Sequence, residues 1–80
     1  MQEIFERMQK IISEQFGVDE DSVSKSTSFE EDLGADSVDL VELVMAMEDE
    51  FKIGEVGEDE LAGLSTVGDC VNFLAKKLDA

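Results

Sequence analysis

Apolar residues recur at helical spacing in three stretches of the sequence, and no stretch alternates apolar with polar residues as a half-buried strand would. This pattern excludes a sheet and requires helices that pack on one another. The first stretch places six apolar residues at helical spacing: Ile4, Phe5, Met8, Ile11, Ile12 and Phe16. Gly17 follows, and glycine readily adopts the left-handed conformation that ends a helix. We therefore expect the first helix to end at about residue 16.

Capping patterns predict where the other helices begin. Asp36 is a favoured N-cap for a helix that runs to about Phe51. Thr66 and Asp69 have the spacing of a capping box at the start of the last helix. That helix places four apolar residues at the spacing of a core stripe: Val67, Val71, Leu74 and Leu78. Glycines between these two helices leave room only for a short helix over Glu58 to Ala62.

A long polar segment, Val18 to Asp36, separates the first helix from the second. Because a structureless loop of that length is unusual in a compact domain, we expect it to be ordered. Three apolar residues are spaced to pin it to the core: Val23, Phe29 and Leu33. Ser28 and Glu31 have capping spacing and predict a short turn within it. The expected fold is all-α: a small bundle of three main helices plus one short helix, with residues 1–80 as a single domain.

The chain is strongly acidic, with 21 acidic and 6 basic residues and a formal charge of −15. Nucleic acid is excluded as a ligand, because binding it requires clustered Lys and Arg. An anionic membrane surface would repel the chain for the same reason. No apolar run approaches the roughly 20 residues of a membrane span, so we expect no membrane insertion. The expected partners have basic surfaces that attract the chain over long distances.

Histidine is absent and cysteine occurs once, at Cys70. Without histidine, the Ser-His-Asp and Cys-His catalytic systems and His-ligated metal sites are excluded. A single cysteine cannot form an internal disulfide, which favours a reducing compartment. No basic residue is adjacent to Cys70 in the sequence, which predicts a buried, inert thiol. We therefore expect a non-catalytic protein without catalytic residues or a metal site of its own.

The second helix has more apolar residues than one buried face requires. At about 100° per residue, five of them form one stripe, which we expect to face the core: Leu40, Leu43, Val44, Met47 and Phe51. A second stripe lies about 130° away and has an acidic rim: Val38, Val41 and Met45, with Glu42, Glu48 and Asp49. Two interpretations remain open. Either the first helix and the long loop cover both stripes, or the second stripe is an exposed docking site for a hydrophobic and basic partner.

Ser37 follows the N-cap Asp36 in the first turn of the second helix. Gly34 permits a positive-φ turn before it, and we expect the small side chain of Ala35 to leave the approach open. From spacing alone, an incidental first-turn serine is the commoner explanation. The alternative is a hydroxyl offered to another enzyme, since a phosphate attached there would lie at the positive end of the helix dipole.

Residues 32–39, with the sequence DLGADSVD, resemble the phosphopantetheine attachment motif of acyl carrier proteins. Residues 41–51 are similar to the second helix of the same family, and residues 65–69 to the start of its last helix. The resemblance covers essentially the whole chain. It departs from the family pattern at Val38, where the family usually has Leu, and at Gly57, where it often has Pro.

The resemblance implies that Ser37 carries a 4′-phosphopantetheine arm, supported by Asp36 of the same motif. It also implies that a holo-carrier-protein synthase transfers the arm from coenzyme A with Mg²⁺. The thiol of the arm would hold growing acyl chains as thioesters for the enzymes of fatty acid synthesis, which would dock through basic patches. The implied docking residues are Val38, Val41, Glu42, Met45, Glu48 and Asp49. We further expect a monomer in the cytoplasm of a bacterial cell.

Three alternatives stay open from the residues. A carrier of polyketide or peptide synthesis would share the serine motif. An acidic interaction module without covalent chemistry would need neither the serine nor the turn before it. An EF-hand calcium loop would use Asp19, Asp21 and Glu30 at positions one, three and twelve. Val23 and Ser24, however, stand where that loop needs a ligand and a glycine, which argues against it.

Overall fold

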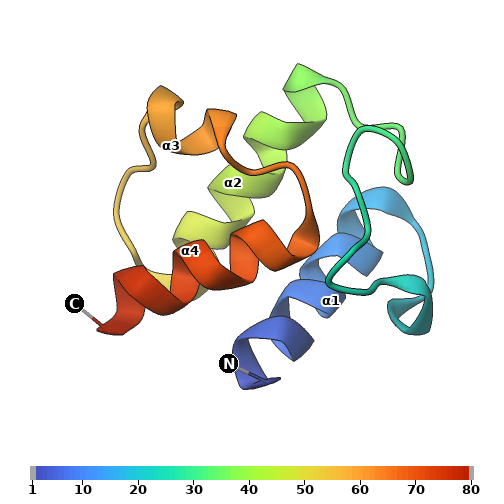
Figure 1. Cartoon of the computed structure of the whole chain (residues 1–80), viewed down its shortest axis with the longest axis horizontal. Helices are drawn as coiled ribbons and strands as arrows, with labels where there is room; N and C mark the ends of the chain where they lie inside the picture. Colours follow the sequence, from blue (N-terminus) through green and yellow to red (C-terminus); the bar gives the residue numbers. More distant parts are fainter. Residues whose placement is uncertain (1, 80) are drawn as a thin grey trace.

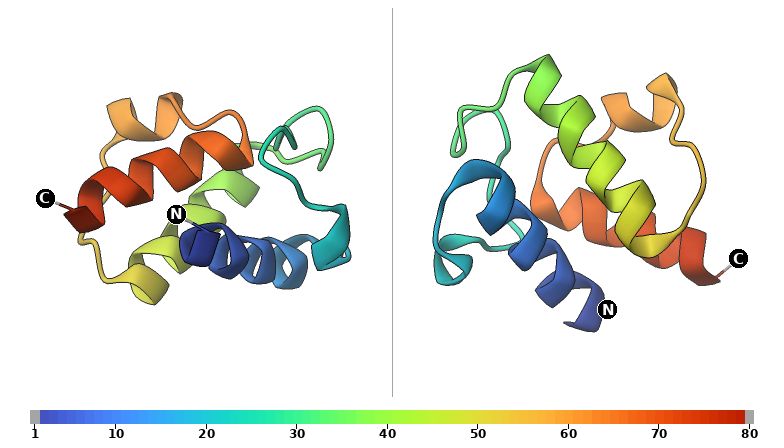
Figure 2. Two further views of the ribbon diagram at one scale, coloured as in Figure 1. Left: turned by 60° about the horizontal axis from the view of Figure 1, so that its bottom comes forward. Right: turned by 180° about the vertical axis from the view of Figure 1, so that it is seen from behind.

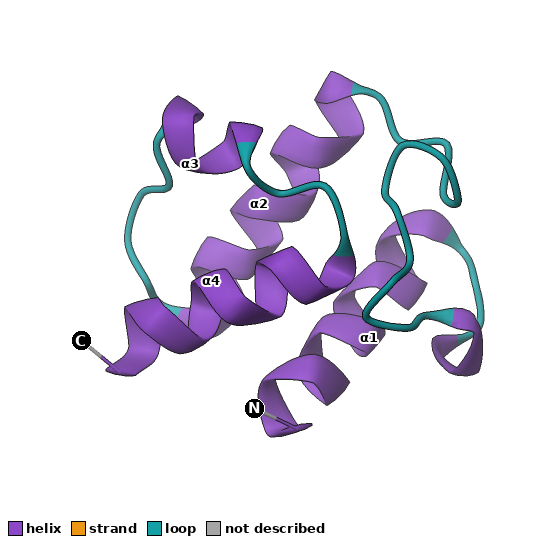
Figure 3. Cartoon of the chain, viewed as in Figure 1, coloured by secondary structure: helices purple, strands orange, loops and turns teal. Residues whose placement is uncertain are grey.

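The computed structural model describes residues 2–79, and its regular elements are all helices. In chain order these are α1 (Gln2–Phe16), the 3₁₀-helix η1 (Glu20–Ser22), α2 (Ser37–Phe51), α3 (Glu58–Ala62) and α4 (Val67–Asp79) (Figure 1). Figure 3 shows the long loop between α1 and α2. The predicted all-α fold of three main helices plus one short helix is confirmed. None of the helices in this part of the chain has the length and apolar character needed to cross a membrane.

The three long helices pack around one core. In the views of Figures 1 and 2, α1 runs in the direction opposite to α2 and α4. The most completely buried apolar side chains come from all three helices and from the loop: Met8, Ile12, Phe29, Leu43, Met47, Val67, Val71 and Leu74. Leu78 was predicted to belong to the core, and this prediction is wrong, because 47% of the residue is exposed. It lies near the C-terminal end of α4, which projects past the other helices (Figure 1).

Arg7 connects α1 to the end of α2. Its guanidinium donates hydrogen bonds to the Glu50 carboxylate, with an Nη2–Oε2 distance of 2.7 Å and an Nε–Oε2 distance of 3.1 Å. Nη2 also donates to the backbone oxygen of Glu50 at 3.0 Å, and the guanidinium carbon lies 4.4 Å from the centroid of the Phe51 ring. A planar guanidinium can make all these contacts at once. Arg7 therefore stabilises the α2 terminus, where a backbone carbonyl lacks a helical partner.

Apolar packing orders the loop between α1 and α2, as predicted. Val23 and Phe29 are buried, and Leu33 is half-buried. The predicted turn at Ser28 is present, with the Glu31 N–H donating to the Ser28 Oγ at 3.2 Å. The reciprocal acceptor is Asp32 rather than Glu31, because the Ser28 N–H donates to the Asp32 Oδ2 at 2.7 Å. The turn is therefore one residue wider than the capping pattern predicts.

The same loop is hydrogen-bonded to the start of α4, a contact between segments about 40 residues apart in the sequence. The Val67 N–H donates to the Thr27 oxygen at 3.0 Å, and the Gly68 N–H donates to the Lys25 oxygen at 2.8 Å. A Cβ at Gly68 would lie 3.0 Å from that oxygen, so glycine permits the close approach. These bonds satisfy N–H groups that have no partner within the first turn of a helix. They hold the loop, and with it the start of α2, against the core.

The segment that could have been an EF-hand loop has a different structure. Residues 20–22 form η1, Ser28 forms an isolated antiparallel bridge with Thr66, and Glu30 is exposed in a turn rather than at the start of a helix. A calcium loop of this class needs a helix directly after its twelfth residue. Within the described residues, no group of three or more acidic or Cys side chains is arranged to hold a metal ion. The EF-hand interpretation is therefore wrong.

Candidate functional site

Ser37 is the first residue of α2, and its position is set by the turn that precedes it. Gly34 has a φ of 63°, which confirms the predicted positive-φ turn. Ala35 does not lie open beside the serine as expected. Its side chain is buried in the core, and its N–H donates to the Phe29 oxygen at 2.8 Å. Ala35 therefore anchors the turn, while Asp36 and Ser37 are exposed.

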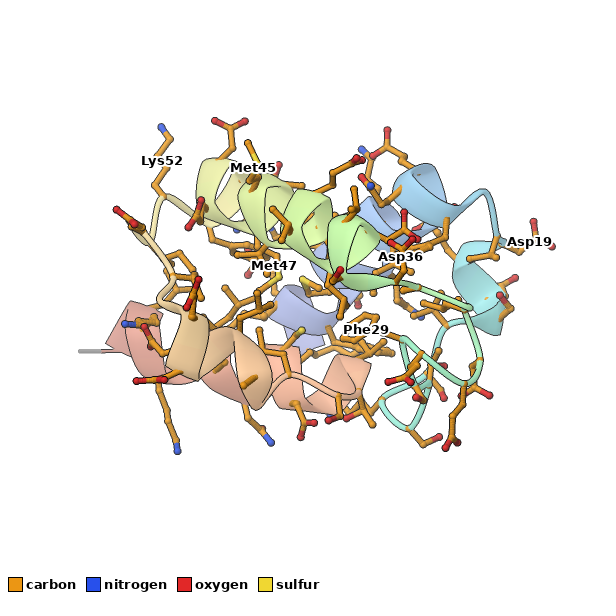
Figure 4. All side chains as sticks on the ribbon, turned by 90° about the horizontal axis from the view of Figure 1, so that it is seen from above. Asp19, Phe29, Asp36, Met45, Met47 and Lys52 are labelled. Carbon is orange, nitrogen blue, oxygen red and sulfur yellow. The ribbon has the colours of Figure 1, made fainter. Side chains whose placement is uncertain are left out.

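A reciprocal capping box fixes the first turn of α2. The Asp39 N–H donates to the Asp36 Oδ1 at 2.9 Å, and the Asp36 N–H donates to the Asp39 Oδ2 at 3.2 Å. The predicted N-cap is confirmed, and its partner Asp39 contributes more than the negative charge expected from the sequence. Figure 4 shows Asp36 at the start of the helix. The cap holds the backbone of Ser37 in helical geometry at the N-terminal end of α2.

The surroundings of Ser37 suit a covalently attached phosphate. We find no hydrogen bond from the Ser37 or Val38 N–H groups to other residues in the 2–79 segment. N–H groups of this kind at the positive end of a helix dipole stabilise an anion. The exposed Ser37 hydroxyl makes no hydrogen bond within that segment, and the chain has no histidine to deprotonate it. Ser37 can therefore accept a group from another enzyme, but no base among the described residues is hydrogen-bonded to its hydroxyl.

The second apolar stripe of α2 is exposed. The exposed fractions of Val38, Val41 and Met45 are 62%, 46% and 61%, so neither α1 nor the loop covers them. Figure 4 shows Met45 on the outer side of α2 and Met47 on its inner side. The stripe predicted to face the core is buried, except that Leu40 is half-buried. Of the two interpretations left open by periodicity, the exposed stripe is confirmed.

The three acidic residues around this stripe differ in their surroundings. Asp49 and Glu42 are exposed, and the Gln15 Nε2 of α1 donates to the Glu42 Oε2 at 3.1 Å. Glu48 is half-buried, and its Oε2 accepts a hydrogen bond from the Val56 N–H at 2.7 Å. Glu48 is therefore hydrogen-bonded to the backbone of another segment, whereas the carboxylates of Asp49 and Glu42 are exposed to solvent.

A groove lies between α2 and the segment that contains α3. It has a volume of about 250 Å³ and is lined by apolar side chains and three carboxylates: Val41, Val44, Met45, Val56 and Leu61, with Glu48, Glu55 and Glu58. Val56 and Leu61 were not among the site residues predicted from the sequence. The sequence feature that could have indicated them is that these two apolar residues lie on either side of an acidic segment. α3 itself has no buried residue, so this wall of the groove packs lightly against the bundle.

Cys70 is the only thiol of the chain, and it is buried. Burial raises the pKa of this thiol to about 12, and the negative charge of the adjacent Asp69 adds to the effect. The predicted burial is confirmed, and a neutral thiol is a poor nucleophile. Cys70 therefore does not form part of the site at Ser37.

Comparison with known proteins identifies the class to which this fold and this exposed serine belong. Residues 6–74 match the family described as "Phosphopantetheine attachment site". The chain is 51% identical over 79 residues to the curated acyl carrier protein of Guillardia theta, with 99% of this chain and 96% of that protein covered. A solved structure of the acyl carrier protein from Enterococcus faecalis, from a study of its high thermal stability, has a TM-score of 0.78 and 32% identity. That match covers 95% of each chain.

The chain belongs to the acyl carrier protein family. The cofactor of this family is 4′-phosphopantetheine, and its members are generally non-catalytic carriers. The exposed hydroxyl and the N–H groups at the start of α2 fit a phosphodiester group of this kind. The family match also makes an acidic interaction module without covalent chemistry an inadequate description of the chain.

Proposed function

We propose that this chain, acting as one domain, carries acyl groups for fatty acid synthesis on a 4′-phosphopantetheine arm attached to Ser37. The observation that carries the proposal is the placement of Ser37, which is exposed on the first turn of a capped helix. The match to a phosphopantetheine attachment family supports it. A phosphopantetheinyl transferase supplies the arm from coenzyme A, together with Mg²⁺ and the base that activates Ser37.

The residues of the chain hold and orient the arm. When attached, the arm supplies a thiol that carries an acyl chain as a thioester. The N–H groups of Ser37 and Val38 stabilise the phosphate, because they lie at the positive end of the α2 dipole. Asp36 positions Ser37 by capping the helix, with its carboxylate 2.9 Å from the Asp39 nitrogen. The thioester extends from a fixed point on the surface rather than from a mobile loop.

The exposed stripe of α2 is the proposed docking surface for enzymes that act on the thioester. Its apolar residues follow Ser37 on the same helix, and it presents the charges of Glu42 and Asp49 to solvent. Apolar contact with a charged rim is the usual composition of such a surface. Enzymes with basic patches are the expected partners, and the formal charge of −15 attracts them. We propose that the protein is a monomer, since a second copy on this face would block docking.

The groove between α2 and α3 is the proposed shelter for the acyl chain. Its apolar walls begin at Val41 of α2, one turn beyond Ser37, and continue to Val56 and Leu61. Burying each methylene of a guest chain contributes about 0.8 kcal/mol. A cytoplasmic location is proposed with the same function, since coenzyme A and a reduced Cys70 belong to a reducing compartment.

Intact-mass spectrometry after incubation with coenzyme A, Mg²⁺ and a phosphopantetheinyl transferase tests the attachment site. We expect the wild type to gain the mass of one phosphopantetheine group and Ser37→Ala to gain none. Ser65→Ala is the matched control, because Ser65 is also exposed and also lies just before a capped helix. Circular dichroism checks that Ser37→Ala is folded. Labelling of Ser37→Ala at another residue would contradict the proposal.

The pathway is tested by offering the loaded protein to purified enzymes. We expect malonyl transfer and elongation by the fatty acid synthesis enzymes, with products released as saturated chains. A loaded protein that is elongated only by polyketide or peptide synthesis enzymes would support that alternative instead.

A further inference from the structure

Glu48 makes a contact that distinguishes it from the other acidic residues of the exposed stripe. It lies near the end of α2, and its Oε2 accepts the backbone N–H of Val56 at 2.7 Å. Val56 directly precedes Gly57, the N-cap of α3. The hydrogen bond therefore joins α2 to the segment from which α3 begins.

The segment between α2 and α3 has few other attachments. No backbone–backbone hydrogen bond joins residues 53–56 to any other part of the described chain. Lys52 and Gly54 both have left-handed backbone, with φ values of 53° and 81°, and no atom lies within 4 Å of the position of a Gly54 Cβ. Ile53 and Val56 are only half-buried. The Glu48 carboxylate is thus the main polar attachment of this segment to α2.

The first turn of α3 is also attached to a different helix. Glu60 accepts a hydrogen bond from the Gly57 N–H at 3.3 Å, and its Oε2 lies 3.0 Å from the Lys77 Nζ of α4. This ion pair connects α3 to α4 but does not connect it to α2. The distance between α2 and Val56, which is the width of the groove at that point, therefore depends on Glu48. Glu48 itself lines the groove.

We propose that Glu48 is a positioning residue for the acyl chain, because its carboxylate holds the Val56 wall of the groove at a fixed distance from α2. This inference rests on the proposed carrier function and assigns Glu48 to the retention of the chain rather than to the docking of enzymes. The acceptor oxygen, and not the negative charge, is the property that matters. At a residue that acts only as a docking charge, loss of the charge would matter and loss of the acceptor oxygen would not.

Four variants separate these two properties. Glu48→Gln keeps an acceptor oxygen but removes the charge, and Glu48→Ala removes both. Asp49→Asn and Asp49→Ala are matched controls, because Asp49 is adjacent and exposed and its side chain makes no hydrogen bond within the described residues. Each protein is loaded with butanoyl-, hexanoyl- or octanoyl-phosphopantetheine, and loading is verified by intact mass. The rate of thioester cleavage by hydroxylamine then reports how well the chain is sheltered.

We expect hexanoyl and octanoyl thioesters to be cleaved more slowly than butanoyl thioesters in the wild type, in Glu48→Gln and in both Asp49 variants. In Glu48→Ala we expect this protection to fall about five- to tenfold, which corresponds to the net contribution of one ordinary hydrogen bond. Equal protection in Glu48→Ala and the wild type would overturn the proposal. A loss in Glu48→Gln as large as in Glu48→Ala would also overturn it, since it would show that the charge is required.

A measurement on the unmodified wild type covers the case in which Glu48→Ala does not fold. We expect the Val56 amide to exchange with solvent more slowly than the Gly54 and Glu55 amides, because only Val56 has an acceptor. Equal exchange at the three amides would contradict the proposal. Failure of the carrier function itself is distinguishable, because the wild type would then gain no phosphopantetheine mass at all.

Discussion

Replacement of Asp36 tests whether the capping box holds Ser37 in place. Asp36→Ala removes the acceptor of the Asp39 N–H, which lies 2.9 Å from the Asp36 Oδ1. It also removes one negative charge from a chain with a formal charge of −15, and relief of repulsion would mask part of the loss. Asp36→Asn removes the same charge but keeps a cap of equal quality. The difference between the two variants therefore isolates the cap.

We expect Asp36→Ala to be about 1 kcal/mol less stable than Asp36→Asn, the usual cost of losing an N-cap. For a domain of this size, that corresponds to a fall of roughly 4–8 °C in Tm. Urea unfolding followed by circular dichroism measures the free energy of unfolding. The rate of phosphopantetheine transfer should fall in Asp36→Ala as the first turn frays. Equal stabilities for the Ala and Asn variants would refute the assignment of Asp36 as a cap that orients Ser37.

Three further predictions concern charge and ionisation. Glu42→Lys should slow phosphopantetheine transfer by about three- to tenfold at low salt and by less at high salt. The control Glu3→Lys on α1 should have little effect. Initial rates of transfer at several salt concentrations measure the difference. Because the pKa of Cys70 is about 12, only about one thiol in ten thousand is ionised at pH 8. Iodoacetamide should therefore label the denatured protein and leave the native protein unlabelled. Rapid labelling of the native protein would contradict the buried position of Cys70. The pKa of Glu60 lies below its ordinary value, chiefly because its carboxylate accepts a hydrogen bond from Lys77 and then because it accepts one from the Gly57 N–H. The contribution of this carboxylate to folding stability is therefore present above the ordinary carboxyl pKa and is lost as the pH falls through the folded value. Lys77→Ala should therefore raise the Glu60 pKa in an NMR titration and lower stability at neutral pH, but not at about pH 2; an unchanged Glu60 titration would exclude the ion pair.

The boundaries of the helices could be predicted because their causes are local. Asp36 caps α2 through a residue three positions away, and Thr66 and Asp69 do the same for α4. Gly17, with a φ of 68°, follows the last residue of α1. The short helix also has its expected limits, Glu58–Ala62. Interactions within one helical turn depend on neighbouring residues alone, so the order of residues is sufficient to predict them.

The residues whose surroundings the sequence does not predict depend on contacts beyond one helical turn. Leu78 has core spacing but extends past its neighbours, because the other helices end before it. Ala35 is buried because Phe29 draws the turn toward the core. Glu48 has the same spacing as the docking charges, and that spacing does not reveal its hydrogen bond to Val56, eight residues later. Helical periodicity contains no information about such contacts.

For the site as a whole, the sequence alone determined that Ser37 lies in the first turn of α2 and that this helix has two apolar stripes. Whether the second stripe remains exposed was decided only by the tertiary structure. α1, α4 and the loop bury Leu43 and Met47 on one side and leave Val38 and Met45 uncovered on the other. Periodicity measures the angle between residues on one helix, whereas exposure depends on which other elements pack against it.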